Sequence, residues 1–146
     1  MKGRTFIDSN VFLYAAEKGA LEKSHQAATW LRYLLGSGVG VANLQVMNEI
    51  TNVLIKRGRM EAEEIFPIVD SYSLFGTTPL SEETVAAARL LHFETSFSWW
   101  DCLLLASAIE LQCTNFLSED LQDQRKIRGL TIINPFRHSP PQRPLH

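Results

Sequence analysis

Short apolar runs alternate along this chain with longer segments in which apolar residues recur every three or four positions. The short runs predict strands at residues 4–8, 39–43, 74–80 (strand and loop), 115–118 and 130–134. The longer segments predict helices at residues 11–19, 20–38, 44–58, 61–73, 81–92 and 98–112. Strands that alternate with helices are typical of a parallel sheet covered by helices on both faces.

Particular residues mark where these helices begin, end or bend. Gly19 is expected to end the first helix, and Asn43 to cap the third. Ser81 is followed by two glutamates, which predicts a strong helix start. Pro67 is expected to kink or divide the helix that contains it.

Two helices are expected to contribute most to the core. The segment 98–112 is apolar nearly all round, so we expect it to be buried. The segment 20–38 is amphipathic, and its expected apolar side consists of Leu21, Ala28, Leu31, Leu34 and Leu35.

The chain has 146 residues, about the size of one domain, and its net charge of −2 gives it no general attraction for nucleic acid. We expect a domain at residues 1–136 and a flexible, proline-rich tail at 137–146. The two cysteines, Cys102 and Cys113, lie in apolar surroundings, as core residues of a reducing compartment do. The N-terminus has no apolar signal region and the longest apolar run cannot span a bilayer, so we expect a cytoplasmic protein with no membrane partner.

Four acidic residues stand where an α/β sheet places its ligand sites or where charge is costly. Asp8 and Asp120 each follow a predicted strand, and such ends meet at one edge of a parallel sheet. Glu49 borders the apolar face of its helix, and Asp101 lies on a helix that looks buried. Each acid alone also has a structural explanation, because Asp8, Asp101 and Asp120 can cap or turn the chain and Glu49 can be a solvated boundary residue.

The joint placement of the four carboxylates favours a shared site. Isolated buried charges are costly, whereas hard divalent cations take oxygen ligands. A carboxylate cluster holding one or two such ions suits hydrolysis of a phosphodiester by a metal-activated water. Ser9 and Asn10 could then cap the first helix and leave Asp8 free to face the metal.

At this point the chain resembles a known family, the PIN-domain ribonucleases, and most closely the VapC-type toxins of toxin–antitoxin pairs. The matching pieces are "FIDSNVFLYA", "NEITNVL", "SFSWWDCLLLASAIELQC", "FLSEDLQD" and "GLTIINPF". They occur in the order and at the spacing of the family, over about residues 4–136. "DSNV" alone is a weak signal, and the pieces together are specific.

The resemblance implies a three-layer α/β/α sandwich around a mainly parallel sheet of about five strands. It implies a type II toxin that is an endoribonuclease dependent on Mg²⁺ or Mn²⁺, with Asp8, Glu49, Asp101 and Asp120 as catalytic and metal-binding residues. Asn10 and Ser118 match supporting polar positions. The implied partners are an RNA substrate, a VapB-type antitoxin with a helix in a groove between the early helices, and a second copy of the chain. Residues 11–35 are apolar enough to build that groove, and equally to be core.

The chain departs from the family pattern near its last acids. A second acid often follows two residues after the first, and Gln122 stands there, so the contributions of Glu119 and Asp123 stay open. The segment around Arg125, Lys126 and Arg128 is basic and could contact RNA phosphates, or be a solvated loop.

Three other protein classes compete with a PIN-domain ribonuclease as the interpretation of this sequence. A receiver domain needs an acidic pair near its first strand and a late lysine, and "FIDSNV" has no such pair. A haloacid-dehalogenase-like phosphatase needs a second aspartate two residues after Asp8, where Asn10 stands. A PIN-like module that binds RNA or a partner without cleavage remains the alternative to an enzyme.

Overall fold

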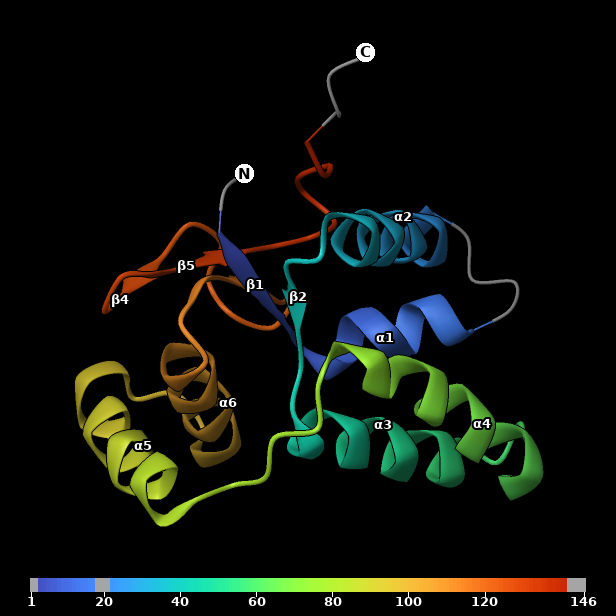
Figure 1. Cartoon of the computed structure of the whole chain (residues 1–146), viewed down its shortest axis with the longest axis horizontal. Coiled ribbons are helices and arrows are strands. Elements are labelled where there is room, and N and C mark those ends of the chain that lie inside the picture. The colour runs from blue at the N-terminus through green and yellow to red at the C-terminus, as the bar shows by residue number, and fades with distance from the viewer. Residues whose placement is uncertain (1–2, 18–21, 142–146) are drawn as a thin grey trace.

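The structure is a computed structural model that describes residues 3–17 and 22–141, with helices after each of the first two strands and three consecutive strands at the end (Figure 1). In chain order the elements are β1 (Arg4–Ile7), α1 (Ser9–Ala16), α2 (Glu22–Ser37), β2 (Gly40–Val41), α3 (Leu44–Arg57), α4 (Ala62–Tyr72), the 3-10 turn η1 (Ser73–Phe75), α5 (Glu82–Thr95), α6 (Trp99–Glu110), β3 (Cys113–Leu117), β4 (Lys126–Ile127) and β5 (Leu130–Ile133). The predicted α/β class is confirmed. The predicted end of the first helix at Gly19 and the core position of Leu21 lie outside the described residues.

The sheet has five strands in the order β2-β1-β3-β5-β4. All neighbours are parallel except β4, which runs antiparallel to β5. From β1 the chain moves to one side to form β2 and then crosses to the other side to form β3. Right-handed crossovers in opposite directions leave their helices on opposite faces, which makes the three layers. Figure 1 shows α2 on one side of the sheet and the α5–α6 pair on the other.

The core lies between the central strands and the helices that cover them. Phe6 of β1 stacks on Phe116 of β3, with ring centroids 5.5 Å apart. The expected burial of α6 is confirmed, since every residue from 102 to 108 is buried. Both cysteines are free and buried, as expected.

The apolar side of α2 is rotated from the expected one. Leu31 and Leu34 are buried as predicted, whereas Leu35 is 56% exposed. Trp30, which the pattern did not single out, is 1% exposed and belongs to the buried side of α2. Its indole N–H donates to the backbone oxygens of Pro135 and His138, so a polar atom of this large core side chain is satisfied by the C-terminal segment.

The strand predicted at residues 74–80 is wrong. Residues 73–75 form η1, and Thr78 makes only a single bridge to Asn43. Gly76 has a φ of 139°, and a Cβ there would lie 2.4 Å from the backbone oxygen of Ala42. The chain therefore turns away from the extended conformation at the point where it passes closest to β2.

The fifth strand, β4, lies in the basic segment around residues 125–128, for which no strand was predicted. Lys126 and Ile127 form β4, and Arg128 and Gly129, with φ values of 48° and 81°, make the two-residue turn into β5. Two residues are too few for a periodic signal. Two helix starts are confirmed, since Asn43 and Ser81 are N-caps. Pro67 lies inside α4 without dividing it, and α5 runs on to Thr95, beyond the end predicted at His92.

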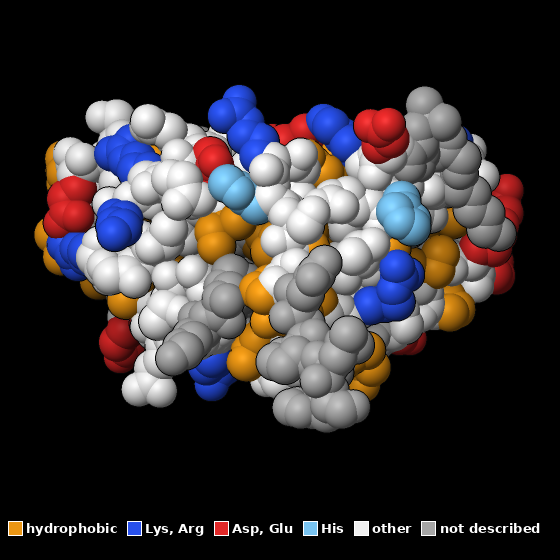
Figure 2. All heavy atoms as spheres, turned by 90° about the horizontal axis from the view of Figure 1, so that it is seen from above, with side chains coloured by type: hydrophobic (Ala, Val, Ile, Leu, Met, Phe, Trp, Pro, Cys, Tyr) orange, Lys and Arg blue, Asp and Glu red, His pale blue; other side chains and the backbone are white. Residues whose placement is uncertain are grey.

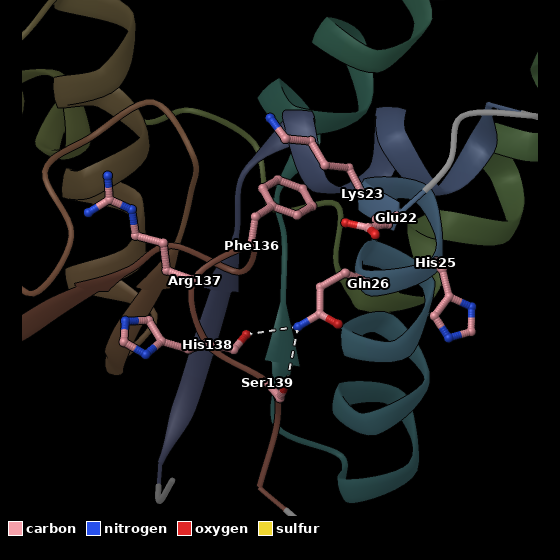
Figure 3. Close-up of a pocket in the computed structure, with 8 residues that line it drawn as sticks. All are labelled: Glu22, Lys23, His25, Gln26, Phe136, Arg137, His138 and Ser139. Carbon is pink, nitrogen blue, oxygen red and sulfur yellow. Dashed lines mark hydrogen bonds between the residues drawn. The ribbon is translucent and has the colours of Figure 1, made fainter.

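The described part of the C-terminal segment lies against α2. Figure 3 shows Gln26 of α2 pointing toward this segment, where its amide donates to the His138 backbone oxygen at 3.0 Å and to the Ser139 hydroxyl at 3.4 Å. A hollow of about 810 Å³ lies between the two, and Lys23, Phe136 and Arg137 also line it. The predicted boundary at residue 136 stays a prediction, and residues 142–146 of the predicted tail lie outside the described residues.

The surface carries both charges in mixture. On the face drawn in Figure 2, Lys and Arg side chains alternate with Asp and Glu and form no continuous basic area. Across residues 3–17 and 22–141, none of the helices combines the length and the apolar character that crossing a membrane requires.

Candidate active site

Asp8 stands at the carboxyl end of β1 and begins α1. Its backbone is extended, with φ −72° and ψ 156°, and its Oδ1 accepts the Ser9 backbone N–H at 2.7 Å. Asp8 is therefore itself the N-cap, and the expectation that Ser9 or Asn10 caps the helix is wrong. The side chain is 3% exposed, and its Oδ2 accepts the Ser118 hydroxyl at 2.8 Å and the Asn10 amide at 3.3 Å.

The turn after β3 delivers Asp120 to the same place. The Asp8 backbone N–H donates to the Leu117 oxygen, which joins the ends of β1 and β3. The Asn10 amide donates to Asp120 Oδ2 at 3.0 Å, and the Asp120 backbone N–H donates to the Ser118 hydroxyl oxygen at 3.1 Å. Asn10 and Ser118 therefore connect Asp8 with Asp120, two aspartates that lie 112 residues apart in the sequence.

Glu49 and Asp101 approach from two helices. Glu49 is half-buried on α3, and its Oε1 is buried with no hydrogen-bond partner among the described residues. Asp101 is half-buried in the first turn of α6, where the Ser98 hydroxyl caps the helix by accepting the Asp101 backbone N–H. The Gln45 amide donates to the Trp100 backbone oxygen at 3.2 Å and so ties α3 to the start of α6.

The four carboxylates act on one another electrostatically. Burial, with the charges of Asp101 and Asp120, raises the pKa of Asp8 to about 6, against the Ser118 and Ser9 hydrogen bonds. Burial, with the charges of Asp8, Asp101 and Asp120, raises the pKa of Glu49 to about 7. Burial and Asp120 also raise the pKa of Asp101. Like charges brought together in this way favour protonation or a bound cation.

The donor set fits a hard divalent cation. All four acids offer oxygen, and Glu49 Oε1 is a buried acceptor for which the described residues supply no donor. Among the described residues no Lys, Arg or His forms an ion pair with any of the four. Within the same residues, no group of three or more acidic, His or Cys side chains is arranged to hold a metal ion, so the metal-binding role of the four acids stays a prediction.

Ion pairs that the sequence did not predict lie beside this cluster. Glu119 pairs with Lys23, and Glu17 pairs with Arg57. A hollow of about 190 Å³ adjoins Asp120, and its lining includes Glu17, Arg57 and Glu119. These pairs join residues up to 96 positions apart, and no local spacing connects them.

The remaining candidates lie in other surroundings. The Arg125 guanidinium lies over the Phe97 ring at 4.6 Å, Arg128 pairs with Glu94, and Lys126 is exposed on β4 at the sheet edge. Their contact with RNA stays a prediction. Asp123 faces the C-terminal segment, where it accepts the Asn134 backbone N–H at 2.8 Å and bonds to His138.

Comparison with known proteins gives the following relatives. The family model described as "PIN domain" matches residues 5–130. Curated protein sequences yield no match. A toxin–antitoxin complex from Klebsiella pneumoniae aligns with a TM-score of 0.63 at 17% identity, over 90% of this chain and 97% of the other. VapBC2 from Rickettsia felis, bound to promoter DNA, aligns with a TM-score of 0.65 at 15% identity, over 88% and 96%. VapC20 from Mycobacterium tuberculosis, a sarcin-ricin loop cleaving toxin, aligns with a TM-score of 0.58 at 16% identity, over 80% and 91%.

Proposed function

This chain belongs to the PIN-domain family, and from that premise we propose that it is a metal-dependent endoribonuclease, the toxin of a type II toxin–antitoxin pair. PIN domains are generally nucleases, and they typically use divalent metals. The observation that carries the proposal is the cluster of four carboxylates, in which burial and neighbouring acids raise the pKa of Asp8, Glu49 and Asp101 and no described residue supplies a cationic partner.

Asp8, Glu49, Asp101 and Asp120 would hold Mg²⁺ or Mn²⁺. When bound, such an ion supplies positive charge for the phosphate and lowers the pKa of a coordinated water. Ser118 and Asn10 hold Asp8 by donating to its Oδ2, which fixes the carboxylate plane. Asn10 also holds Asp120, so one amide orients two of the proposed ligands.

Metal binding and RNA cleavage are tested together. We expect Mn²⁺ to bind in calorimetry and to activate cleavage of RNA to 5′-phosphate and 3′-hydroxyl products. Asp101→Asn should weaken both, because it removes a charged oxygen ligand. A variant that cleaves like the unmodified chain would overturn the assignment. Metal-independent RNA binding without cleavage by the unmodified chain would instead favour a binding module.

The antitoxin partner is part of the proposal. Two of the solved structures that share this fold are toxin–antitoxin assemblies by their titles. Most apolar residues of α1 and α2 are core, including Val11, Phe12 and Leu34. A hollow of about 310 Å³ remains between the end of α1 and helices α3 and α4, with Ala16, Leu54, Met60 and Ile68 in its lining. A VapB-type helix would place apolar side chains there.

The partner test uses the neighbouring gene. A small protein encoded directly upstream should co-purify with this chain and inhibit its cleavage of RNA. Met60→Glu should release it, because a carboxylate would replace one of the four apolar side chains of the hollow, whose lining also includes Glu17, Arg57, Arg59 and Glu64. Copurification unaffected by Met60→Glu would place the antitoxin elsewhere. A homodimer in the cytoplasm is expected from the family, and sedimentation of the purified chain tests the dimer.

A further inference from the structure

A second hollow adjoins the acidic cluster on the side of α3 and α6. It has a volume of about 520 Å³ and is lined by Leu44, Gln45, Asn48, Glu49, Asn52, Leu80 and Trp100. We call it the Trp100 hollow. Glu49 belongs both to this lining and to the acidic cluster, and Trp100 directly precedes Asp101. Whatever occupies the hollow therefore lies beside the proposed cleavage site.

The lining combines one aromatic face with several amides. Trp100 is 64% exposed, although it is the largest apolar side chain of the lining. The bond from the Gln45 amide to the Trp100 backbone oxygen fixes the start of α6 against α3. Asn48 and Asn52 are one turn apart on α3 and both exposed, so their amides lie on the same side of the helix.

This chemistry fits a nucleobase better than a phosphate or an apolar helix. Among the described residues of the lining none is Lys, Arg or His and one is an acid, so this lining repels a phosphate. An apolar helix face would cover the exposed amides of Asn48 and Asn52 without offering them hydrogen bonds, at a cost for each. A base offers a π-face for the indole and a polar edge for amide donors and acceptors.

We propose that the Trp100 hollow binds an unpaired base of the RNA next to the cleaved phosphate, with the Trp100 indole as the stacking surface and Asn48 and Asn52 as hydrogen-bonding partners of the base edge. The chain would then require a single-stranded segment at the cleavage site, because a base inside a duplex is already stacked between its neighbours and its pairing edge is occupied. The inference rests on the proposed function for the identity of the substrate.

The test measures binding separately from cleavage. A fluorescent single-stranded oligoribonucleotide is titrated against the full chain in EDTA, which prevents metal-dependent cleavage, and again with Ca²⁺. We expect Trp100→Ala to weaken binding about 5- to 100-fold, the range for loss of one stacked base. Trp100→Phe should restore most of the affinity. Phe93→Ala is the matched control, since Phe93 is 85% exposed on α5 and outside the lining, and it should bind normally.

An abasic oligonucleotide completes the test. One abasic site at the sensitive position should remove the difference between the unmodified chain and Trp100→Ala. Equal affinity of these two proteins for the intact RNA, or no binding by the unmodified chain in either buffer, overturns the inference. A change in the sedimentation of RNA-free Trp100→Ala overturns it too, because the hollow would then be a contact between copies. If the unmodified chain does not cleave RNA with Mn²⁺, the proposed function is wrong, and the measured binding affinities still test the Trp100 hollow separately.

Discussion

Asp8 and Asp123 are two aspartates held in similar ways near the ends of parallel strands, yet their pKa values shift in opposite directions. Each accepts one backbone N–H, from Ser9 at 2.7 Å and from Asn134 at 2.8 Å. Burial and two neighbouring acids raise the pKa of Asp8 to about 6. At Asp123 burial also opposes ionisation, but the Asn134 N–H, His138 and the Gln124 amide outweigh it and lower the pKa.

The charged form of Asp123 stabilises the fold, whereas the charged form of Asp8 destabilises it. Asp123 joins β5 to the C-terminal segment through its bond to His138, and its charge is compensated there. Asp8 is more deeply buried, and among the described residues its charge faces other acids. A group that costs stability in the free protein is expected where a ligand later compensates it.

The largest expected effect is on RNA cleavage. Asp8→Asn removes one charged ligand and should reduce Mn²⁺-dependent kcat/KM by about 10²–10³-fold, since a catalytic metal contributes several kcal/mol. Asp123→Asn is the matched control and should stay within about twofold, because it changes the same group outside the cluster. Equal losses in the two variants would erase the distinction between the two aspartates.

The next effect is on the stability of the metal-free chain. An acid with a raised pKa binds more protons in the folded state than in the unfolded state, so the free energy of unfolding falls as the acid ionises. For Asp8 this loss extends from about pH 4 to about pH 6. For Glu49 it continues to about pH 7. Asp8→Asn should therefore stabilise the protein at pH 8 in EDTA, by up to about 3 kcal/mol. Asparagine also caps helices, so the start of α1 is kept.

Urea unfolding at pH 5 and pH 8 measures this effect. The gain from Asp8→Asn should shrink at pH 5, where Asp8 is already largely protonated, and Mn²⁺ should stabilise the unmodified chain more than the variant. Asp8→Asn that is less stable than the unmodified chain at pH 8 would mean that the carboxylate is compensated within the fold.

Much of the placement of the acidic cluster could be predicted from the sequence. Alternating strands and helices place Asp8 and Asp120 at one sheet edge, and an acid on an apolar helix such as Asp101 is conspicuous by itself. Periodicity could not show that Asp8 caps its own helix, because Ser9 and Asn10 are equally good caps by type. It also could not separate Asp123 from the cluster, since that depends on His138 and Asn134 meeting it in space.

Contacts between distant segments account for the other failures. The buried indole N–H of Trp30 is satisfied by the backbone oxygens of Pro135 and His138, and no local pattern contains that information. The strand expected at residues 74–80 is replaced by a turn because Gly76 passes against Ala42. β4 exists because β5 pairs with it over two residues. Tertiary contacts override weak local preferences in each case.

A smaller effect is expected from Ser118, which holds Asp8. Ser118→Ala removes the donor at 2.8 Å and should reduce cleavage about 10- to 100-fold, as losses of ligand-supporting residues do. The Ser118 bond lowers the pKa of Asp8, so its removal should raise that pKa and move the pH–rate profile for cleavage to higher pH. Ser118→Thr keeps the hydroxyl and should restore both rate and profile. An unchanged profile in Ser118→Ala would mean that the bond does not tune Asp8.

The smallest expected effect is the stability cost of Asp123→Asn, about 1 kcal/mol at pH 7, because a hydrogen bond to a charged group near the surface is replaced by a neutral one. The lowered pKa of Asp123 gives the opposite sign from Asp8: its contribution is present above the ordinary aspartate pKa of about 4 and is lost as pH falls below it. Urea unfolding at pH 7 and pH 3 should therefore show a cost that disappears in acid. His138→Ala removes the same partnership from the other side, and the double variant should cost less than the sum of the two single changes. Strict additivity would mean that Asp123 and His138 stabilise the fold separately, and the contrast with Asp8 would then rest on the Asn134 N–H.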